Sequence, residues 1–230
     1  MSRTVVVTGG AKGIGKSVAE RFSTDDVHAP GHEELDVTNE ERVTAFFERL
    51  GDVDVLVNNA GVAASASLVR TTLEDWRAHL DVNATGAFLC TRAVVGGMIE
   101  RGDGRIVTVA SVAGLAGARY TAAYAASKHA AIGLMRATAA EVAGTGVTAN
   151  AVCPAWVRTG MTRRTVENIV AKTGRTAEDA EAELKGMTPL GRMLEPEEVA
   201  AAVVFLASPE AAAINGQVLV LDGGGLQSWA

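Results

Sequence analysis

Short, uninterrupted apolar runs alternate with longer stretches of helical pattern along the chain, and this alternation limits the fold more than any other feature. Strands without polar positions are buried on both faces, which is typical of a parallel sheet covered by helices on both sides. The sequence therefore predicts an α/β protein with a doubly wound parallel sheet. The expected strands lie at residues 3–8, 26–30, 52–58, 105–111, 147–152 and 217–222.

The length, charge and cysteine content of the chain narrow its class. A chain of 230 residues is long enough for one large core, so residues 1–230 are expected to form a single domain. The formal net charge of −6 gives no basic field for nucleic acid. No run of eighteen uninterrupted apolar residues occurs, so we expect no membrane partner. The two cysteines fit a reducing compartment, and we expect a cytoplasmic protein that acts on a small molecule.

Two stretches depart from the alternating pattern. Residues 23–35 have room for one short strand and a turn but not for another crossover helix. Residues 158–195 are polar, charge-mixed and helical in pattern, and we expect them to form a helical substrate lid. A solvated helical pair is the alternative for this segment. Helix caps are expected at Thr38 and Thr72, because each has an acidic residue three positions later.

A glycine-rich turn, TGGAKGIG at residues 8–15, follows the first expected strand and precedes a helix. Gly9, Gly13 and Gly15 stand at the spacing G-x-x-x-G-x-G. Glycines let the backbone approach a pyrophosphate, whose charge is stabilised by unpaired N–H groups at the helix N-terminus. Because any tight strand-to-helix connection favours glycine, it is the place of this turn after the first strand that indicates a dinucleotide site.

The choice between NAD and NADP depends on the acidic residue that holds a ribose hydroxyl. Asp36 lies at about the expected distance along the chain for that residue. The run at 26–30 is, however, the better second strand, and this interpretation places Asp36 after a third strand. No carboxylate then ends the second strand to repel a 2′-phosphate. Lys12 is able to pair with that phosphate. An exposed lysine without a role in cofactor binding is an equally good interpretation, so the sequence favours NADP only slightly.

Three residues further along carry groups suited to proton transfer. Ser111 ends an expected strand at the carboxyl edge, where open parallel sheets place their sites. Tyr124 and Lys128 are four residues apart and share one face of a helix. A nearby ammonium lowers the pKa of a phenol, so we expect Lys128 to tune Tyr124 for exchanging protons with a carbonyl or alcohol oxygen that Ser111 also holds. Each residue alone has an ordinary structural explanation, and only their conjunction is specific.

Motifs along nearly the whole chain resemble those of the short-chain dehydrogenase/reductase family. They are TGGAKGIG (8–15), NNAG (58–61), DVNATG (81–86), Ser111, YAASK (124–128), NAVCPAWVRT (150–159) and LDGG (221–224). The resemblance implies a Rossmann-type domain with about seven parallel strands, a nicotinamide cofactor and hydride transfer to or from a carbonyl. It also implies a catalytic tetrad of Asn83, Ser111, Tyr124 and Lys128.

The resemblance gives each member of the tetrad a role. Tyr124 is the general acid in reduction and the base in oxidation, and Ser111 positions the substrate oxygen. Lys128 binds the nicotinamide ribose, and Asn83 holds a water in the proton relay. No metal ion is expected.

Cofactor contacts are also implied by the resemblance. Asp36 and Val37 are expected at the adenine, Asn59 beside the adenosine ribose, and Val157 and Thr159 along the nicotinamide. The full set of expected cofactor residues is Gly9, Lys12, Gly13, Ile14, Gly15, Asp36, Val37, Asn59, Ala60, Gly61, Tyr124, Lys128, Pro154, Val157 and Thr159.

Within the family, the chain resembles 3-oxoacyl-thioester reductases, 3-hydroxyacyl-CoA dehydrogenases and polyketide ketoreductases. We expect an NAD(P)-dependent reductase of 3-oxoacyl or related ketone substrates. One alternative is a secondary-alcohol or 3-hydroxyacyl dehydrogenase that works oxidatively, and another is a non-catalytic dinucleotide-binding regulator. The chain departs from the family pattern at two places. Ala155 follows Pro154 where many members have glycine, and the second helix of the usual fold is missing. Members usually form tetramers, so we expect a homotetramer or homodimer that pairs the helices starting near Leu73 and Ala122.

Overall fold

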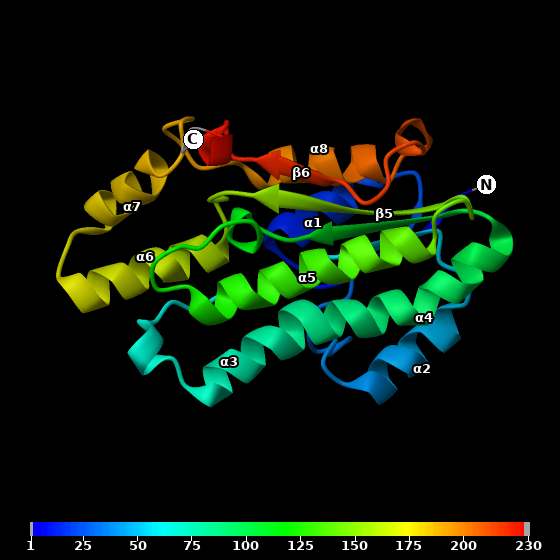
Figure 1. Ribbon diagram of the computed structural model, residues 1–230, viewed down its shortest axis with the longest axis horizontal. Helices are drawn as coiled ribbons and strands as arrows, with labels where there is room; N and C mark the ends of the chain where they lie inside the picture. The colour runs from blue at the N-terminus through cyan, green and yellow to red at the C-terminus, as the bar shows by residue number, and fades with distance from the viewer. Residues whose placement is uncertain (1, 228–230) are drawn as a thin grey trace.

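Six parallel strands form one sheet in the computed structural model, which describes residues 2–227. The strands pair in the order β2-β1-β3-β4-β5-β6 (Figure 1). Each of the six expected runs supplies one strand, and the predicted α/β class is confirmed. The strands are β1 (Thr4–Val7), β2 (Asp26–His28), β3 (Val55–Asn58), β4 (Gly104–Val109), β5 (Val147–Pro154) and β6 (Val218–Leu221).

The count of seven strands and the placing of Asp36 after a third strand are both wrong. Between β2 and the helix α2 (Glu40–Leu50) the chain forms turns, and the part of the chain that the structure describes has no strand there. The reason is length, because a further parallel strand needs a crossover connection of a dozen or more residues. Asp36 therefore lies in an irregular segment that leads from the edge strand β2 directly to α2.

Helices cover both faces of the sheet, and each face has its own core. On one face, α1 (Gly13–Arg21) and α8 (Pro196–Leu206) pack on the strands through a cluster that includes Val18 and Val203. On the other, α2, α4 (Gly86–Arg101) and α5 (Ala122–Glu141) pack through a cluster that includes Ile132. Short helical turns are η1 (Leu68–Arg70), η3 (Val112–Gly114), η4 (Pro209–Ala211) and η5 (Gly225–Gln227).

One long helical segment runs from α3 (Leu73–Leu80) through a π-helical turn, η2 (Asp81–Thr85), into α4. Thr72 caps its start, and a capping box with Asp75 confirms the predicted helix start. By its length and composition alone, this segment could cross a membrane. A core helix of a soluble protein has the same length and composition, so this is weak evidence. Its packing on the sheet is that of a core helix.

The predicted cap at Thr38 is wrong by one residue. Asn39 is the N-cap of α2, and its side-chain oxygen accepts a hydrogen bond from Arg42 N at 2.9 Å. The Thr38 hydroxyl donates instead to Asp36 Oδ1 at 2.7 Å. The acidic carboxylate two residues before the threonine competes for its hydroxyl and so removes it from the helix terminus.

The segment predicted as a lid forms two helices, α6 (Gly160–Thr173) and α7 (Ala177–Gly186). Both lie beyond the ends to which β5 and β6 point (Figure 1). They share a small core of their own, in which Val166 of α6 packs with Ala180 and Leu184 of α7. The segment thus lies at the carboxyl edge of the sheet, where an open parallel sheet binds its ligands.

Candidate active site

The loops after β1 and β3 lie side by side at the carboxyl edge of the sheet, because these two strands are neighbours. The order of the strands reverses between them, and open α/β sheets bind ligands at such a switch point. The Thr8 hydroxyl accepts hydrogen bonds from Asn59 N at 3.1 Å and Ala60 N at 3.0 Å. Asn59 Nδ2 donates in return to the carbonyl oxygens of Thr8 at 2.9 Å and Gly9 at 3.2 Å. The glycine turn and the NNAG segment are therefore fixed to each other at the switch point of the sheet.

Two of the predicted glycines are needed for this close approach. Gly9 has φ +64°, and a Cβ atom there would lie 3.0 Å from Ala60 Cα. A Cβ atom on Gly15 would lie 2.4 Å from the side-chain nitrogen of Asn59. Gly13 differs, since it has φ +55° but the atom nearest to an added Cβ would be Thr159 Cγ2 at 3.5 Å. Gly13 therefore lies opposite the segment that follows β5.

The first turn of α1 is suited to an anion. Its N-cap residue, Lys12, is exposed and makes no side-chain capping hydrogen bond. The first N–H groups of an α-helix lack intrahelical partners, so they attract a phosphate group. Ile14, one residue into the helix, packs against the core beneath.

The segment after β5 supplies three further predicted residues. Pro154 ends the strand, and Val157 is buried and forms a parallel bridge with Leu194. Thr159 caps α6, and its side chain accepts a hydrogen bond from Thr162 N. The structure thus brings Thr159 to the glycine turn and places the other two along the same edge of the sheet.

Asp36 and Val37 occupy well-defined positions beside α4. The Asp36 carboxylate accepts hydrogen bonds from Thr38 Oγ1 and Thr38 N, and the hydroxyl bond above all holds the pKa of Asp36 below its usual value. Val37 is buried against Gly86, where a Cβ atom would lie 2.6 Å from Val37 Cγ2. Contact of these two residues with an adenine stays a prediction.

Ser111, Tyr124 and Lys128 meet at the carboxyl end of β4. Ser111 begins η3, and its Oγ accepts a hydrogen bond from Ala113 N at 3.2 Å. The Ser111 side chain also lies near enough to the Tyr124 phenol to favour its ionised form. Lys128 Nζ lies 5.9 Å from the centre of the Tyr124 ring, one turn further along α5. The structure therefore brings together the three side chains that the sequence singled out.

The Lys128 ammonium is buried, with 5% of the residue exposed. Nζ donates to Val109 O at 3.0 Å, which is its one hydrogen bond to residues 2–227. A Cβ atom on Gly61 would lie 3.6 Å from Nζ, so the loop after β3 passes close to the ammonium. Burial lowers the pKa of Lys128 to about 8. Two of its three N–H groups remain available to a ligand.

Asn83 lies in the π-helical turn and is buried. Its Oδ1 accepts a hydrogen bond from Val62 N at 2.9 Å, and its Nδ2 donates to Val62 O at 3.0 Å. The same Nδ2 donates to Ser127 Oγ at 2.9 Å, and Ser127 Oγ donates to Tyr124 O at 2.7 Å. Asn83 therefore joins the loop after β3 to the helix that carries Tyr124. Its predicted hold on a water stays a prediction.

Comparison with known proteins decides the family. The sequence model described as enoyl-(acyl carrier protein) reductase matches residues 5–225. The 3-oxoacyl-(acyl-carrier-protein) reductase FabG of Vibrio cholerae is 37% identical, and the match covers 96% of each chain. The acetoacetyl-CoA reductase of Rhizobium meliloti is 35% identical, with 97% of this chain and 98% of the relative covered. This chain belongs to the short-chain dehydrogenase/reductase family.

A solved relative agrees with this assignment. The structure of a variant actinorhodin polyketide ketoreductase with NADPH matches at a TM-score of 0.88 and 34% identity, over 97% of each chain. The predicted class, an NAD(P)-dependent reductase or dehydrogenase acting on C=O or CH–OH groups, is confirmed. The roles of individual residues in this short-chain reductase remain predictions.

In the protein alone the pKa of Tyr124 is not lowered overall, and the effect of Lys128 on it stays a prediction. Burial raises the pKa of Tyr124 above its usual value, and the nearby Ser111 side chain opposes this only in part. The cause is desolvation, which disfavours the phenolate inside the protein. At neutral pH the tyrosine is thus held in its neutral form.

Sequence reasoning missed two buried residues beside the tyrosine. His79 is 4% exposed, and its ring lies edge-on to the Tyr124 ring with 6.3 Å between centroids. Cys153, near the end of β5, is buried next to Ser111 and Lys128, and burial raises the pKa of its thiol to about 11. A signal for His79 was present, because it precedes Asn83 by four residues in a helical pattern.

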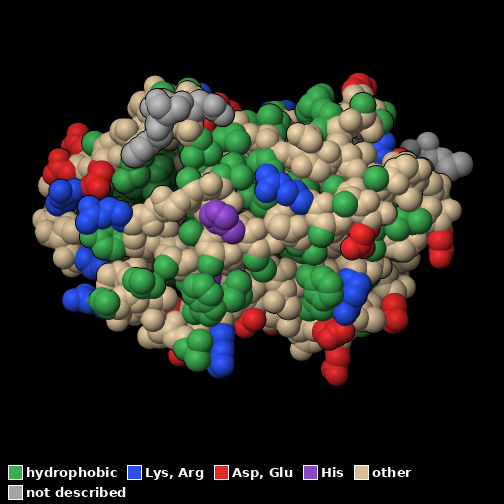
Figure 2. Space-filling model, in the orientation of Figure 1, with side chains coloured by type: hydrophobic (Ala, Val, Ile, Leu, Met, Phe, Trp, Pro, Cys, Tyr) green, Lys and Arg blue, Asp and Glu red, His purple; other side chains and the backbone are tan. Residues whose placement is uncertain are grey.

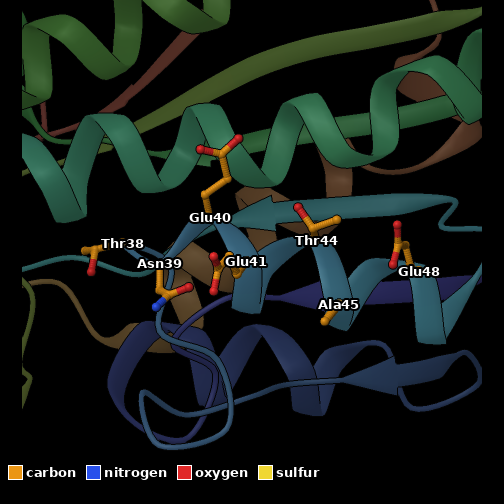
Figure 3. Close-up of a pocket in the computed structure, with 7 residues that line it drawn as sticks. All are labelled: Thr38, Asn39, Glu40, Glu41, Thr44, Ala45 and Glu48. Atoms are coloured by element: carbon orange, nitrogen blue, oxygen red, sulfur yellow. The ribbon is translucent and has the colours of Figure 1, made fainter.

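A broad surface depression lies away from these groups, along the outer side of α2 (Figure 3). Its walls include Glu40, Glu41 and Glu48, whose negative charges would repel the phosphates of a dinucleotide. Glu40 points toward α4, where Arg92 pairs with it at 2.6 Å (Figure 3). We therefore assign no ligand to this depression.

Lys128→Met should change how stability depends on pH. The pKa of Lys128 is about 8 in the folded protein against an ordinary value of 10.5, so the unfolded state binds more protons between these values. The wild-type free energy of unfolding should therefore rise across this window relative to the variant, by up to about 3 kcal/mol. Urea unfolding of both proteins below pH 8 and above pH 10 measures this difference.

Tyr124→Phe is the matched control, because it keeps the buried ammonium. Its stability should follow the wild-type dependence on pH below the ordinary tyrosine pKa of about 10, above which Tyr124 itself contributes. A constant difference between wild type and Lys128→Met across the window would contradict the burial argument.

Proposed function

We propose that this short-chain reductase uses NADPH to reduce the ketone of 3-oxoacyl thioesters or of closely related compounds. The observation that carries the proposal is the meeting of Ser111, Tyr124 and a buried Lys128 at one point of the carboxyl edge. Two hydroxyl groups that lie near each other are placed to share one substrate oxygen. The named relatives, which are ketone reductases by title, support the same reaction.

The residues present fit a nicotinamide dinucleotide. The two free N–H groups of Lys128 are donors for ribose hydroxyls, and the uncapped start of α1 suits the pyrophosphate. Asp36 and Val37 would border the adenine, and Thr159 faces the glycine turn from the nicotinamide side. When bound, the cofactor supplies the hydride that reduces the carbonyl carbon.

The chain itself supplies the proton and the orientation of the carbonyl. Ser111 would donate a hydrogen bond to the substrate oxygen, and Tyr124 would donate the proton as negative charge develops there. Tyr124 is protonated at neutral pH, which the role of proton donor requires.

Preference for NADPH is supported by the residues around the end of β2. The strand ends at His28 and is followed by Ala29 and Pro30, so no carboxylate stands there to repel a 2′-phosphate. Lys12 is exposed, and the neighbouring Ala11 lies close to this segment, since a Cβ atom on Gly31 would lie 3.3 Å from Ala11 Cβ. An ammonium at this place would pair with the phosphate.

The lid helices give weaker information about the substrate. Arg175 pairs with Glu183, Lys185 pairs with Glu181 at 2.8 Å, and Arg163 lies 3.9 Å from Glu167. These cations are neutralised by neighbours, which favours a solvated lid surface over a docking site for carrier phosphates. We propose that α6 and α7 close over the acyl part of the substrate.

Assembly as a homotetramer or homodimer is part of the proposal. The middle of the face formed by α4 and α5 is largely uncharged (Figure 2). Large apolar side chains are exposed along the long helix, among them Leu73 (61%), Phe88 (42%) and Ile99 (39%). A second copy covering this face would bury them. The two free buried cysteines, Cys90 and Cys153, support a reducing, cytoplasmic location.

A substrate panel tests the reaction. With NADPH, the wild type should reduce a 3-oxoacyl thioester and a cyclic ketone, and should leave a 2-enoyl thioester unchanged. Tyr124→Phe should lose at least about a hundredfold in kcat because the proton donor is gone, while its Kd for NADPH stays unchanged. Stopped-flow absorbance and fluorescence titration measure the two quantities.

Other outcomes of the panel point to other functions. Preferred reduction of the enoyl thioester would identify an enoyl reductase. Turnover of secondary alcohols alone would identify an oxidative dehydrogenase, and cofactor binding without any turnover would identify a regulator.

Lys12→Ala should raise KM for NADPH about tenfold and leave KM for NADH nearly unchanged, because one charge-assisted contact to the 2′-phosphate is lost. Lys16→Ala is the matched control, since Lys16 is an exposed lysine on the same helix that lies 3.7 Å from Glu20. Equal effects of both variants on NADPH, or of Lys12→Ala on both cofactors, would reject the assignment.

Sedimentation velocity at micromolar concentration should show a dimer or tetramer. Phe88→Glu should shift the distribution toward monomer by placing a charge in the proposed contact. Wild-type protein that sediments as a monomer would contradict the assembly.

A further inference from the structure

Residues 62–66, here called the strap, continue the loop after β3 beside the proton-transfer groups. At one end, Asn83 hydrogen-bonds to both main-chain groups of Val62. At the other end, Ala66 N donates to Tyr120 O at 3.0 Å. Tyr120 has φ +67°, the single positive value at a non-glycine residue within 2–227, so the chain is strained where it receives the strap.

His79 holds the middle of the strap. Its Nε2 lies 3.0 Å from Ala64 N, and its Nδ1 lies 2.6 Å from Asp75 O. An amide N–H only donates and a carbonyl oxygen only accepts, so Nε2 must accept and Nδ1 must carry the proton. The contacts therefore assign a neutral imidazole with the proton on Nδ1. Both ring nitrogens are used, and neither is available to a substrate.

A cavity of about 100 Å³ lies beside the contact between His79 and Ala64. Ala64, Ser65 and Ala66 line it on one side, and His79 with the start of α5 lines it on the other. Because a cavity supplies no packing atoms, the strap segment beside it is fixed mainly by hydrogen bonds. Lys172 of α6 also donates to Ser65 O at 3.1 Å, but from an exposed side chain.

His79 also contacts the Tyr124 ring. Its ring meets the Tyr124 ring at 74° with 6.3 Å between centroids, a T-shaped contact. The strap begins after Gly61, beside Lys128 Nζ and Asn83 Oδ1. One buried side chain thus touches both the tyrosine and the segment that passes near the lysine.

We propose that His79 is a positioning residue, which sets the separation between the strap and the Tyr124 ring and so the room left for the substrate carbonyl. The proposal deepens the proposed ketone reduction and rests on it. His79 does not contact the reacting atoms. It acts through Ala64 on the strap and through the ring contact on Tyr124.

The matched variants His79→Gln and His79→Asn test this role. The Gln amide is long enough to offer an oxygen near the position of Nε2, so it restores the acceptor for Ala64 N. The Asn amide is one methylene shorter and reaches only the position of Nδ1. We expect kcat for the 3-oxoacyl thioester close to wild type with Gln, and a loss of about 10- to 100-fold with Asn. Kd for NADPH should be unchanged in both, because the strap does not touch the glycine turn.

Equal kcat values for the two variants, or a loss confined to KM for NADPH, would overturn the proposal. If both variants melt at the same temperature and still differ in kcat, a purely structural role is excluded. Loss of folding in both would overturn the proposal, since it would show that His79 serves the core.

A second measurement does not depend on turnover. ¹⁵N NMR of histidine-labelled wild type, with His79 assigned by its absence from His79→Gln, should show a neutral ring protonated at Nδ1. A ring protonated at Nε2 would overturn the geometry. If the wild type reduces no ketone in the panel, the proposed function fails while this spectrum still decides the contact of His79 with the strap.

Discussion

Parallel pairing of β4 between β3 and β5 is the constraint on which the site depends. Asn58 pairs with Thr108, and Val109 pairs with Val152, so the three strands end at nearly the same level. The segments that follow them carry the loop after β3, Ser111 and Pro154 to one edge. A slip of one residue in any of these ladders would move each side chain to the opposite face of the sheet, so the cores on both sides fix the register and with it the site.

The cores also make the site electrostatically costly. Lys128 is held in the interior by the carbonyl oxygen of Val109, and no carboxylate within residues 2–227 pairs with it. Burial disfavours the charged form of both the lysine and Tyr124, so the protein alone keeps the tyrosine as a neutral acid. Burial of such groups therefore lowers the stability of the fold.

The strands, the glycine turn and the Ser–Tyr–Lys group were predictable because each is a local pattern. Apolar runs set the strands, and the spacing of Tyr124 and Lys128 placed them on one helix face. The prediction of a further strand before Asp36 was wrong because the family resemblance was applied to a segment too short to form it. The prediction of a cap at Thr38 was wrong because the Asp36 carboxylate accepts a hydrogen bond from the Thr38 hydroxyl. His79 and the pKa of Tyr124 depend on burial between elements distant in sequence, which no local pattern reports.

The π-helical turn at residues 81–85 has a consequence for how this protein tolerates change in length. In the turn, Gly86 N bonds to Asp81 O, one residue further back than in an α-helix. Each residue of an α-helix advances the side chains by about 100°. Deleting one residue here would leave a regular helix of normal propensity, yet rotate α3 relative to α4 and turn His79 away from Ala64. The long helix is thus sensitive to insertion and deletion at its middle, where its sequence alone shows no break.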